Sequence, residues 1–215
     1  MRRRPSRLGK GGPITQHPSR PAINVGLRIA SAGDVHVGDN VDVEIVLITA
    51  AGHAHGEFFT SQTYLLEWDP ARLGLRGHSA LQDYRLCDFL PGDADGINDH
   101  LDDGIGLLRV WPRPCGHFQV TPDEPFAVAR LHFQATQEGI ADLSPVRKAG
   151  PRLWTAVYKA GFDLVANLQG LSINILPGAV AARRQQAAHA KDHPVKLGTC
   201  RMEITHGHTD GTPSR

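Results

Sequence analysis

One internal segment concentrates carboxylates at a spacing suited to a hard cation. Calcium takes about six to eight oxygen ligands, and alternating Asp residues before a Gly turn direct several of them at one point. If Asp95 and Gly96 are fifth and sixth in a calcium loop, Pro91 stands first, where an acidic ligand would be expected. The predicted calcium ligands are the side chains of Asp93, Asp95, Asp99 and Asp102 and the carbonyl of Ile97.

The alternative for this segment is a solvated acidic connection between two strands. Its charge favours the cation, because five Asp residues stand within eleven positions, 93 to 103, and like charges repel. Asn98 departs from the calcium-loop pattern, because such loops carry an apolar residue at this place. Despite this departure, the density of negative charge leads us to expect a loop with a structural calcium ion.

Other residues suggest binding rather than catalysis. Trp111, Trp154 and Tyr158, with Tyr84, could form a sugar-stacking surface; the alternative for each is packing within or between sheets. The sequence has no G-x-S-x-G elbow and no P-loop, so we expect no enzyme. Paired carboxylates from distant strands stay possible, and they define the alternative of a small carbohydrate-active hydrolase or an accessory domain of one.

Two of the three cysteines, Cys87 and Cys115, bracket the acidic segment. A disulfide between them would stabilise the fold by roughly 3 to 4 kcal/mol in the chain-entropy model. The alternative is two free thiols, of which at least one is buried.

Composition excludes several classes of partner. Lys and Arg total 23 against 22 Asp and Glu, so net charge predicts no nucleic acid partner. No apolar run approaches the roughly 18 residues of a membrane span. The basic start is not followed by an apolar stretch, so no signal peptide is visible.

The elements that must position these residues are short strands. Apolar residues alternate at Ile23 to Ile29, at Val41 to Leu47 and at Phe126 to Ala135, and the segments from Phe58, Leu73, Ile105, Leu153, Phe162 and Leu171 extend the series. Without helical periodicity between them, they predict an all-β antiparallel sandwich, a jelly roll, as a single domain. We expect a disordered basic arm at residues 1–21, the sandwich at 22–177, and a flexible, partly helical tail at 178–215.

Several segments together resemble a cohesin domain, a jelly-roll sandwich related to certain carbohydrate-binding modules. The residues that carry the resemblance are Val37 to Leu47, Leu65 to Leu73 with Trp68-Asp69-Pro70, Phe126 to Phe133, and Gly170 to Ile175. It implies a non-catalytic extracellular or cell-surface module that binds a dockerin-like protein or, less directly, a polysaccharide. The acidic segment, which also resembles the type 3 repeat of thrombospondins, and a basic Trp-containing stretch at 145–161 depart from the cohesin pattern.

Overall fold

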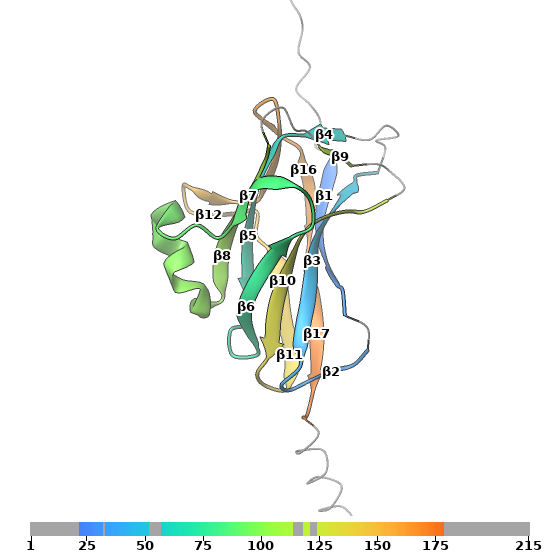
Figure 1. Cartoon of the computed structure of the whole chain (residues 1–215), viewed down its shortest axis with the longest axis vertical. Coiled ribbons are helices and arrows are strands. Elements are labelled where there is room, and N and C mark those ends of the chain that lie inside the picture. The colour runs from blue at the N-terminus through green and yellow to red at the C-terminus, as the bar shows by residue number, and fades with distance from the viewer. Residues whose placement is uncertain (1–21, 32, 52–56, 114–117, 121–123, 179–215) are drawn as a thin grey trace, which may run out of the picture. The chain divides into compact units, whose positions relative to one another are not determined.

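The computed structural model describes residues 22–31, 33–51, 57–113, 118–120 and 124–178 (Figure 1). All of them belong to one compact unit that ends at Gly178. The predicted basic arm and, beyond Gly178, the predicted tail lie outside the described residues.

The first sheet has five strands and displays the alternation that the sequence predicts. Its order is β16 (Val165–Gln169), β1 (Ile23–Ile29), β3 (Asn40–Thr49), β10 (Phe126–Ala135) and β6 (Leu73–Ala80). Neighbours are antiparallel except β1 and β16, which run parallel. Because side chains alternate along a strand, Val41, Val43 and Ile45 of β3 are fully buried and the residues between them face outward.

The second sheet packs against the first. Its order is β15 (Phe162–Asp163), β14 (Ala156–Lys159), β5 (Ser61–Trp68), β11 (Gly139–Pro145), β17 (Leu171–Leu176) and β2 (Val35–His36), with β8 (Ile105–Pro112) on β5 and β7 (Tyr84–Asp88) on β8. Two further pairs are β12 (Lys148–Ala149) with β13 (Leu153–Trp154), and β4 (Glu57–Phe59) with β9 (Phe118–Val120). The β2 and β17 strands are parallel.

The core lies between the two sheets. Tyr64 and Phe133 are among its largest fully buried side chains. Trp68 is 6% exposed, and its ring meets that of Phe133 edge-on at 5.7 Å, so it packs in the core. Asp69 stabilises the turn that follows β5, since its carboxylate accepts the Ala71 N–H at 3.0 Å and its carbonyl accepts the Leu73 N–H at 2.8 Å.

Some elements differ from the sequence prediction. The strand β11 was not predicted, because its buried residues are Ala141, Leu143 and Pro145, of which only Leu143 is large, while Ile140 is 65% exposed. The stretch from Phe58 to Trp68 is two strands, β4 and β5, in different sheets. The predicted loop after β7 contains a 3-10 helix, η1 (Asp93–Asp103), which begins after Gly92 and ends before Gly104, two glycines with positive φ.

The predicted fold class is confirmed: the described chain is an all-β sandwich of the jelly-roll kind, antiparallel apart from β1/β16 and β2/β17. In the part of the chain that the structure describes, no helix is long and apolar enough to cross a membrane.

Candidate functional site

The acidic segment forms η1, which packs on β8 at one side of the sandwich (Figure 1). Of the five predicted calcium ligands, the side chains of Asp93 and Asp95 lie outside what the structure describes. One carboxylate oxygen of Asp99 accepts the Gly92 N–H at 2.9 Å, while Asp102 lines a hollow against β6. Among the described residues no three His, Cys, Asp or Glu side chains are grouped to hold a metal, so the calcium site stays a prediction.

Asn98 has a structural role that the sequence did not predict. It is 7% exposed, and its amide donates to the Leu90 carbonyl at 3.1 Å and to the Leu107 carbonyl at 3.0 Å. Its own oxygen accepts the Leu107 N–H at 2.7 Å. Asn98, one of the residues that depart from the calcium-loop pattern, therefore fastens η1 to β8.

The aromatic candidates separate into two places. Trp111 is 43% exposed near the end of β8. Trp154 and Tyr158 lie together: the indole N–H donates to the Tyr158 hydroxyl at 2.5 Å, and both rings line a hollow of about 250 Å³. Trp111 is not among the residues that line it. Tyr84, in contrast, packs edge-on against Phe118 at 5.0 Å, as its packing alternative predicted.

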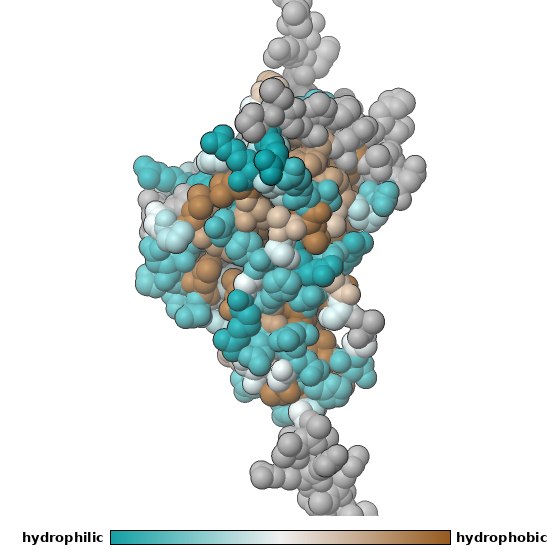
Figure 2. Space-filling view, in the orientation of Figure 1, coloured by the Kyte–Doolittle hydropathy of each residue, from teal (hydrophilic) through white to brown (hydrophobic). Residues whose placement is uncertain are grey.

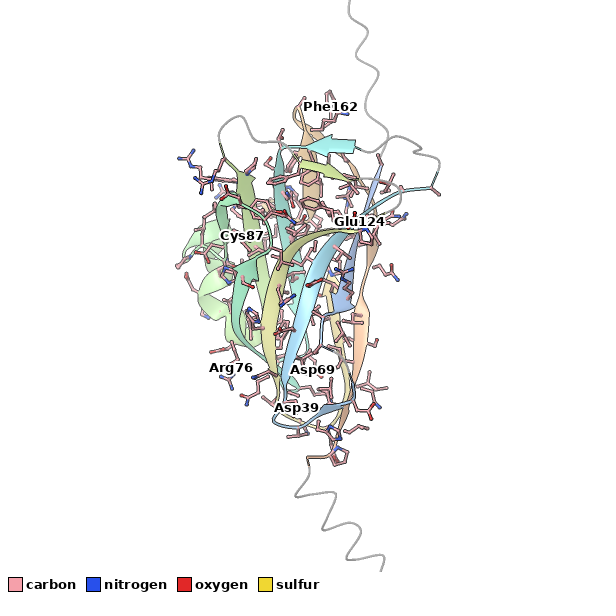
Figure 3. All side chains as sticks on the ribbon, turned by 45° about the vertical axis from the view of Figure 1, so that its right-hand side comes forward. Asp39, Asp69, Arg76, Cys87, Glu124 and Phe162 are labelled. Carbon is pink, nitrogen blue, oxygen red and sulfur yellow. The ribbon has the colours of Figure 1, made fainter. Side chains whose placement is uncertain are left out.

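Cys87 lies half-buried on β7 (Figure 3). Burial, and next the charge of Asp88, raise the pKa of this thiol to about 12. Cys115 lies outside the described residues, so the bridge between the two cysteines stays a prediction.

A connected group of polar side chains lies on the outer face of the five-stranded sheet. We call it the polar face; its members are Arg28 on β1, Asp42 and Glu44 on β3, Arg130 and His132 on β10, and Ser79 on β6. Strand register produces the group, because Glu44 stands opposite both Arg28 and Arg130, and Arg130 stands opposite Ser79. In Figure 2 hydrophilic residues predominate over much of the surface above β3, β10 and β6.

Glu44 is the centre of the polar face. Arg28 approaches one of its carboxylate oxygens at 2.7 Å and Arg130 approaches the other at 2.7 Å, which leaves Glu44 only 6% exposed. Burial acts to raise the pKa of Glu44, but the hydrogen bonds and charges of the two arginines outweigh it and hold that pKa below its ordinary value of 4.5. The hydrogen bond to Glu44 in turn raises the pKa of the Arg130 guanidinium.

His132 continues the network toward β6. Its Nδ1 lies 2.8 Å from an Asp42 carboxylate oxygen, and its Nε2 lies 3.2 Å from the Ser79 hydroxyl. Arg130 also reaches Asp42 at 3.8 Å. The network therefore links four neighbouring strands through ion pairs and hydrogen bonds.

The polar face carries no Phe, Tyr or Trp on any strand that the structure describes. Of the two phenylalanines in this sheet, Phe133 is 1% exposed in the core and Phe126 packs against Phe59 at 5.4 Å. Sequence analysis missed this face as a site, although the alternation that buries Val41 to Leu47 also requires Asp42 and Glu44 to face outward. Their partners on β1 and β10 depend on strand order and register, which the pattern of one strand does not give.

A second hollow of about 270 Å³ lies between β6 and η1. It contains two carboxylates, Asp88 and Asp102, and the imidazole of His78, whose Nε2 is 3.3 Å from an Asp88 oxygen. The Asp88 side chain is 49% exposed. A general acid for glycoside hydrolysis is normally shielded from water so that it stays protonated, and this exposure does not provide that shielding.

Comparison with known proteins gives a structural likeness. No family model and no curated protein matches the sequence. A cohesin module from a family 33 glycoside hydrolase of Clostridium perfringens has a TM-score of 0.51 and 12% identity, over 72% of this chain and 98% of that module.

Two further cohesins are also similar. The seventh ScaB type I cohesin from Pseudobacteroides cellulosolvens has a TM-score of 0.48 and 15% identity, over 74% of this chain and 94% of that one. The OlpA cohesin of Clostridium thermocellum was solved in a type I cohesin–dockerin complex. It has a TM-score of 0.47 and 11% identity, over 72% of this chain and 99% of that one. At such identities the likeness establishes the fold, and this chain has a cohesin-like jelly-roll fold.

Proposed function

We propose that this domain is a non-catalytic module that binds a dockerin-like protein through the polar face. The observation that carries the proposal is the network of Glu44 and its neighbours: a sheet face of fixed charges of both signs, without aromatic rings on the described strands. A glycan-binding sheet face would instead present aromatic rings for stacking. The cohesin-like fold supports a dockerin-like protein as the class of partner.

The arrangement of the charges suits a specific protein partner. Arg28 and Arg130 already hold Glu44, and Asp42 already holds His132, so binding does not have to order these side chains. Paired charges at a protein interface contribute mainly to partner choice and to the rate of association. We therefore expect the domain to bind a partner with the complementary order of charges more tightly than close relatives of that partner.

The test measures binding of the full chain to a panel of dockerin-like modules from its own source organism, by calorimetry. The informative variant is Ser79→Arg, which adds a long cation to the polar face and removes no ion pair. The matched control is Ser172→Arg on β17 of the other sheet, where the serine is exposed. We expect Ser79→Arg to weaken binding at least about tenfold and the control to leave it unchanged; equal effects of the two variants would refute the assignment of the face.

Calcium belongs to the proposal as a structural ion at η1. The support is the negative charge of the segment, because Asp99, Asp102 and Asp103 all lie within the last five residues of η1. Calorimetry with calcium on the full chain should show binding, and millimolar calcium should raise the melting temperature. Asp99→Asn with Asp102→Asn should remove both effects; no heat and no rise in melting temperature for the wild type would exclude the ion.

A second candidate function is carbohydrate binding, which the hydrogen-bonded Trp154 and Tyr158 favour. Their hollow lies away from the polar face, so the two functions do not compete for residues. Binding of neutral oligosaccharides, followed by the indole N–H signal of Trp154 in NMR spectra, tests it. Both candidate functions accord with an extracellular or cell-surface location, which we propose from the resemblance.

A further inference from the structure

The hollow at Trp154 is formed by two short structures on the outside of the second sheet. The β12–β13 hairpin places Lys148 directly opposite Trp154, and β14 supplies Tyr158. Arg147 and Asp163 also line the hollow. Its volume of about 250 Å³ suits a ligand of the size of one sugar ring.

The hollow is firmly attached to the sheet beneath it. The Trp154 carbonyl accepts the Thr63 hydroxyl of β5 at 3.0 Å. Thr155 is fully buried, and its hydroxyl oxygen accepts the Leu65 N–H at 3.1 Å and donates to the Leu65 carbonyl at 3.2 Å. With the indole N–H bonded to Tyr158, the ring of Trp154 is held in place before any ligand arrives.

The charges around the hollow do not cancel. Arg147 and Asp163 form an ion pair at 2.8 Å, and Asp163 is further held by the N–H groups of Val157 and Val165. Lys148 is exposed and has no partner among the residues that the structure describes. Two cations and one anion leave a net charge of +1 at the hollow, so the hollow favours an anion of a single charge.

We propose that this hollow binds a uronic acid, the carboxylate-bearing sugar ring of an acidic polysaccharide. The inference rests on the proposed carbohydrate binding and specifies its ligand. The apolar face of the ring would lie on the indole, and its carboxylate would pair with Lys148, beside Arg147. A neutral sugar would occupy the same hollow but would leave the charge of Lys148 without a partner.

The experiment compares acidic and neutral sugars on the full chain labelled with ¹⁵N. Trimers of galacturonate and of mannuronate are titrated in parallel with trimers of galactose and of mannose. The chain has three tryptophans, and Trp154→Phe identifies the indole signal of Trp154. We expect an acidic trimer to shift that signal saturably and to bind at least about fivefold more tightly than its neutral counterpart.

Two charge-matched variants locate the cation. Lys148→Met should abolish the preference for the acidic trimer and leave binding of the neutral trimer unchanged. Arg85→Met, an equal loss of charge at an exposed position of β7 that does not line the hollow, should preserve the preference.

The outcomes separate the inference from the function on which it rests. Equal binding of acidic and neutral trimers at Trp154 would overturn the uronic acid assignment and keep carbohydrate binding. No shift of any of the three indole signals with any trimer would overturn both. A shift confined to the signal of Trp111 would overturn the location.

Discussion

At the scale of single residues, Glu44 determines the order of the polar face. It is a nearly buried carboxylate whose two oxygens each hold an arginine of a neighbouring strand. Without it, Arg28 would lose this ion pair, and Arg130 would keep only the more distant Asp42, at 3.8 Å. The face therefore depends on a residue that a partner would hardly touch.

Replacing this carboxylate should reduce stability in a pH-dependent way. Because the pKa of Glu44 is lower in the folded chain than its ordinary value of 4.5, its ionised form stabilises the fold above that pH, and the effect is lost as pH falls through the lowered pKa. Glu44→Gln should cost about 1–3 kcal/mol at pH 7. The difference from wild type in urea unfolding should shrink below pH 4.5.

Glu67→Gln, at an exposed position of β5, is the control and should change the free energy of unfolding very little. A loss for Glu44→Gln that is the same at pH 7 and pH 3 would contradict the ion-pair account.

Cys87 gives a prediction of reactivity. A thiol is nucleophilic as the thiolate, so a pKa of about 12 should make Cys87 slow to react at pH 8. In a variant with Ser at positions 115 and 200, alkylation should be at least about tenfold slower in the folded chain than in denaturant. Rapid alkylation of the folded variant, followed by mass spectrometry, would contradict burial of this thiol.

At the scale of elements, η1 is a helix in a segment for which the sequence pattern predicts only a loop. Gly92 and Gly104 set its ends, and Asn98 joins it to β8 by three hydrogen bonds. Ile97 packs outside the second sheet against Leu65 and Leu107, so the helix covers apolar surface that would otherwise face water.

Loss of the Asn98 amide should loosen this helix. Asn98→Ala leaves the Leu107 N–H and two carbonyls without partners, and we expect a cost of about 2–4 kcal/mol. Hydrogen exchange should show faster opening of η1 and of the β8 residues beside it. Unchanged melting temperature and exchange would show that the amide contributes little.

A pair of glycine variants tests the junction between η1 and β8. A Cβ at Gly104 would lie 2.3 Å from the Trp68 carbonyl oxygen, and its φ is 81°; a Cβ at Gly38, with φ 98°, meets nothing within 4 Å. Gly38→Ala should therefore cost only the backbone strain of about 1–2 kcal/mol. Gly104→Ala should cost at least about 2 kcal/mol more, measured by thermal unfolding; equal losses would mean that the close approach relaxes freely.

The elements also show how far sequence reasoning reaches. Strands with several large inward residues, such as β3 and β10, were predicted with nearly correct bounds. The strand β11 was missed because its pairing with β5 and β17, not its own pattern, makes it a strand. Trp154 and Tyr158 were predicted as candidates, but their junction with Arg147 and Asp163 depends on packing that spacing does not reveal.

At the scale of the whole molecule, the candidate binding groups of the sandwich lie on different sheets. The five-stranded sheet bears the polar face, while η1, the hollow at Trp154 and Trp111 lie with the second sheet. Figure 3 places Phe162 at one end of the sandwich and Asp39 and Asp69 toward the other. The proposed protein partner and the proposed sugar would therefore bind separate surfaces of the fold.

Hydroxyl-radical footprinting of the full chain with the proposed dockerin-like partner tests the central claim most directly, since it reports the solvent access of side chains. His132 on the polar face and Trp111 on the second sheet have comparable exposure, 38% and 43%, and both side chains react with the radical. We expect the partner to reduce oxidation of His132 at least about threefold and to leave that of Trp111 unchanged. Protection of Trp111 with His132 unprotected would contradict the assignment of the polar face as the binding surface.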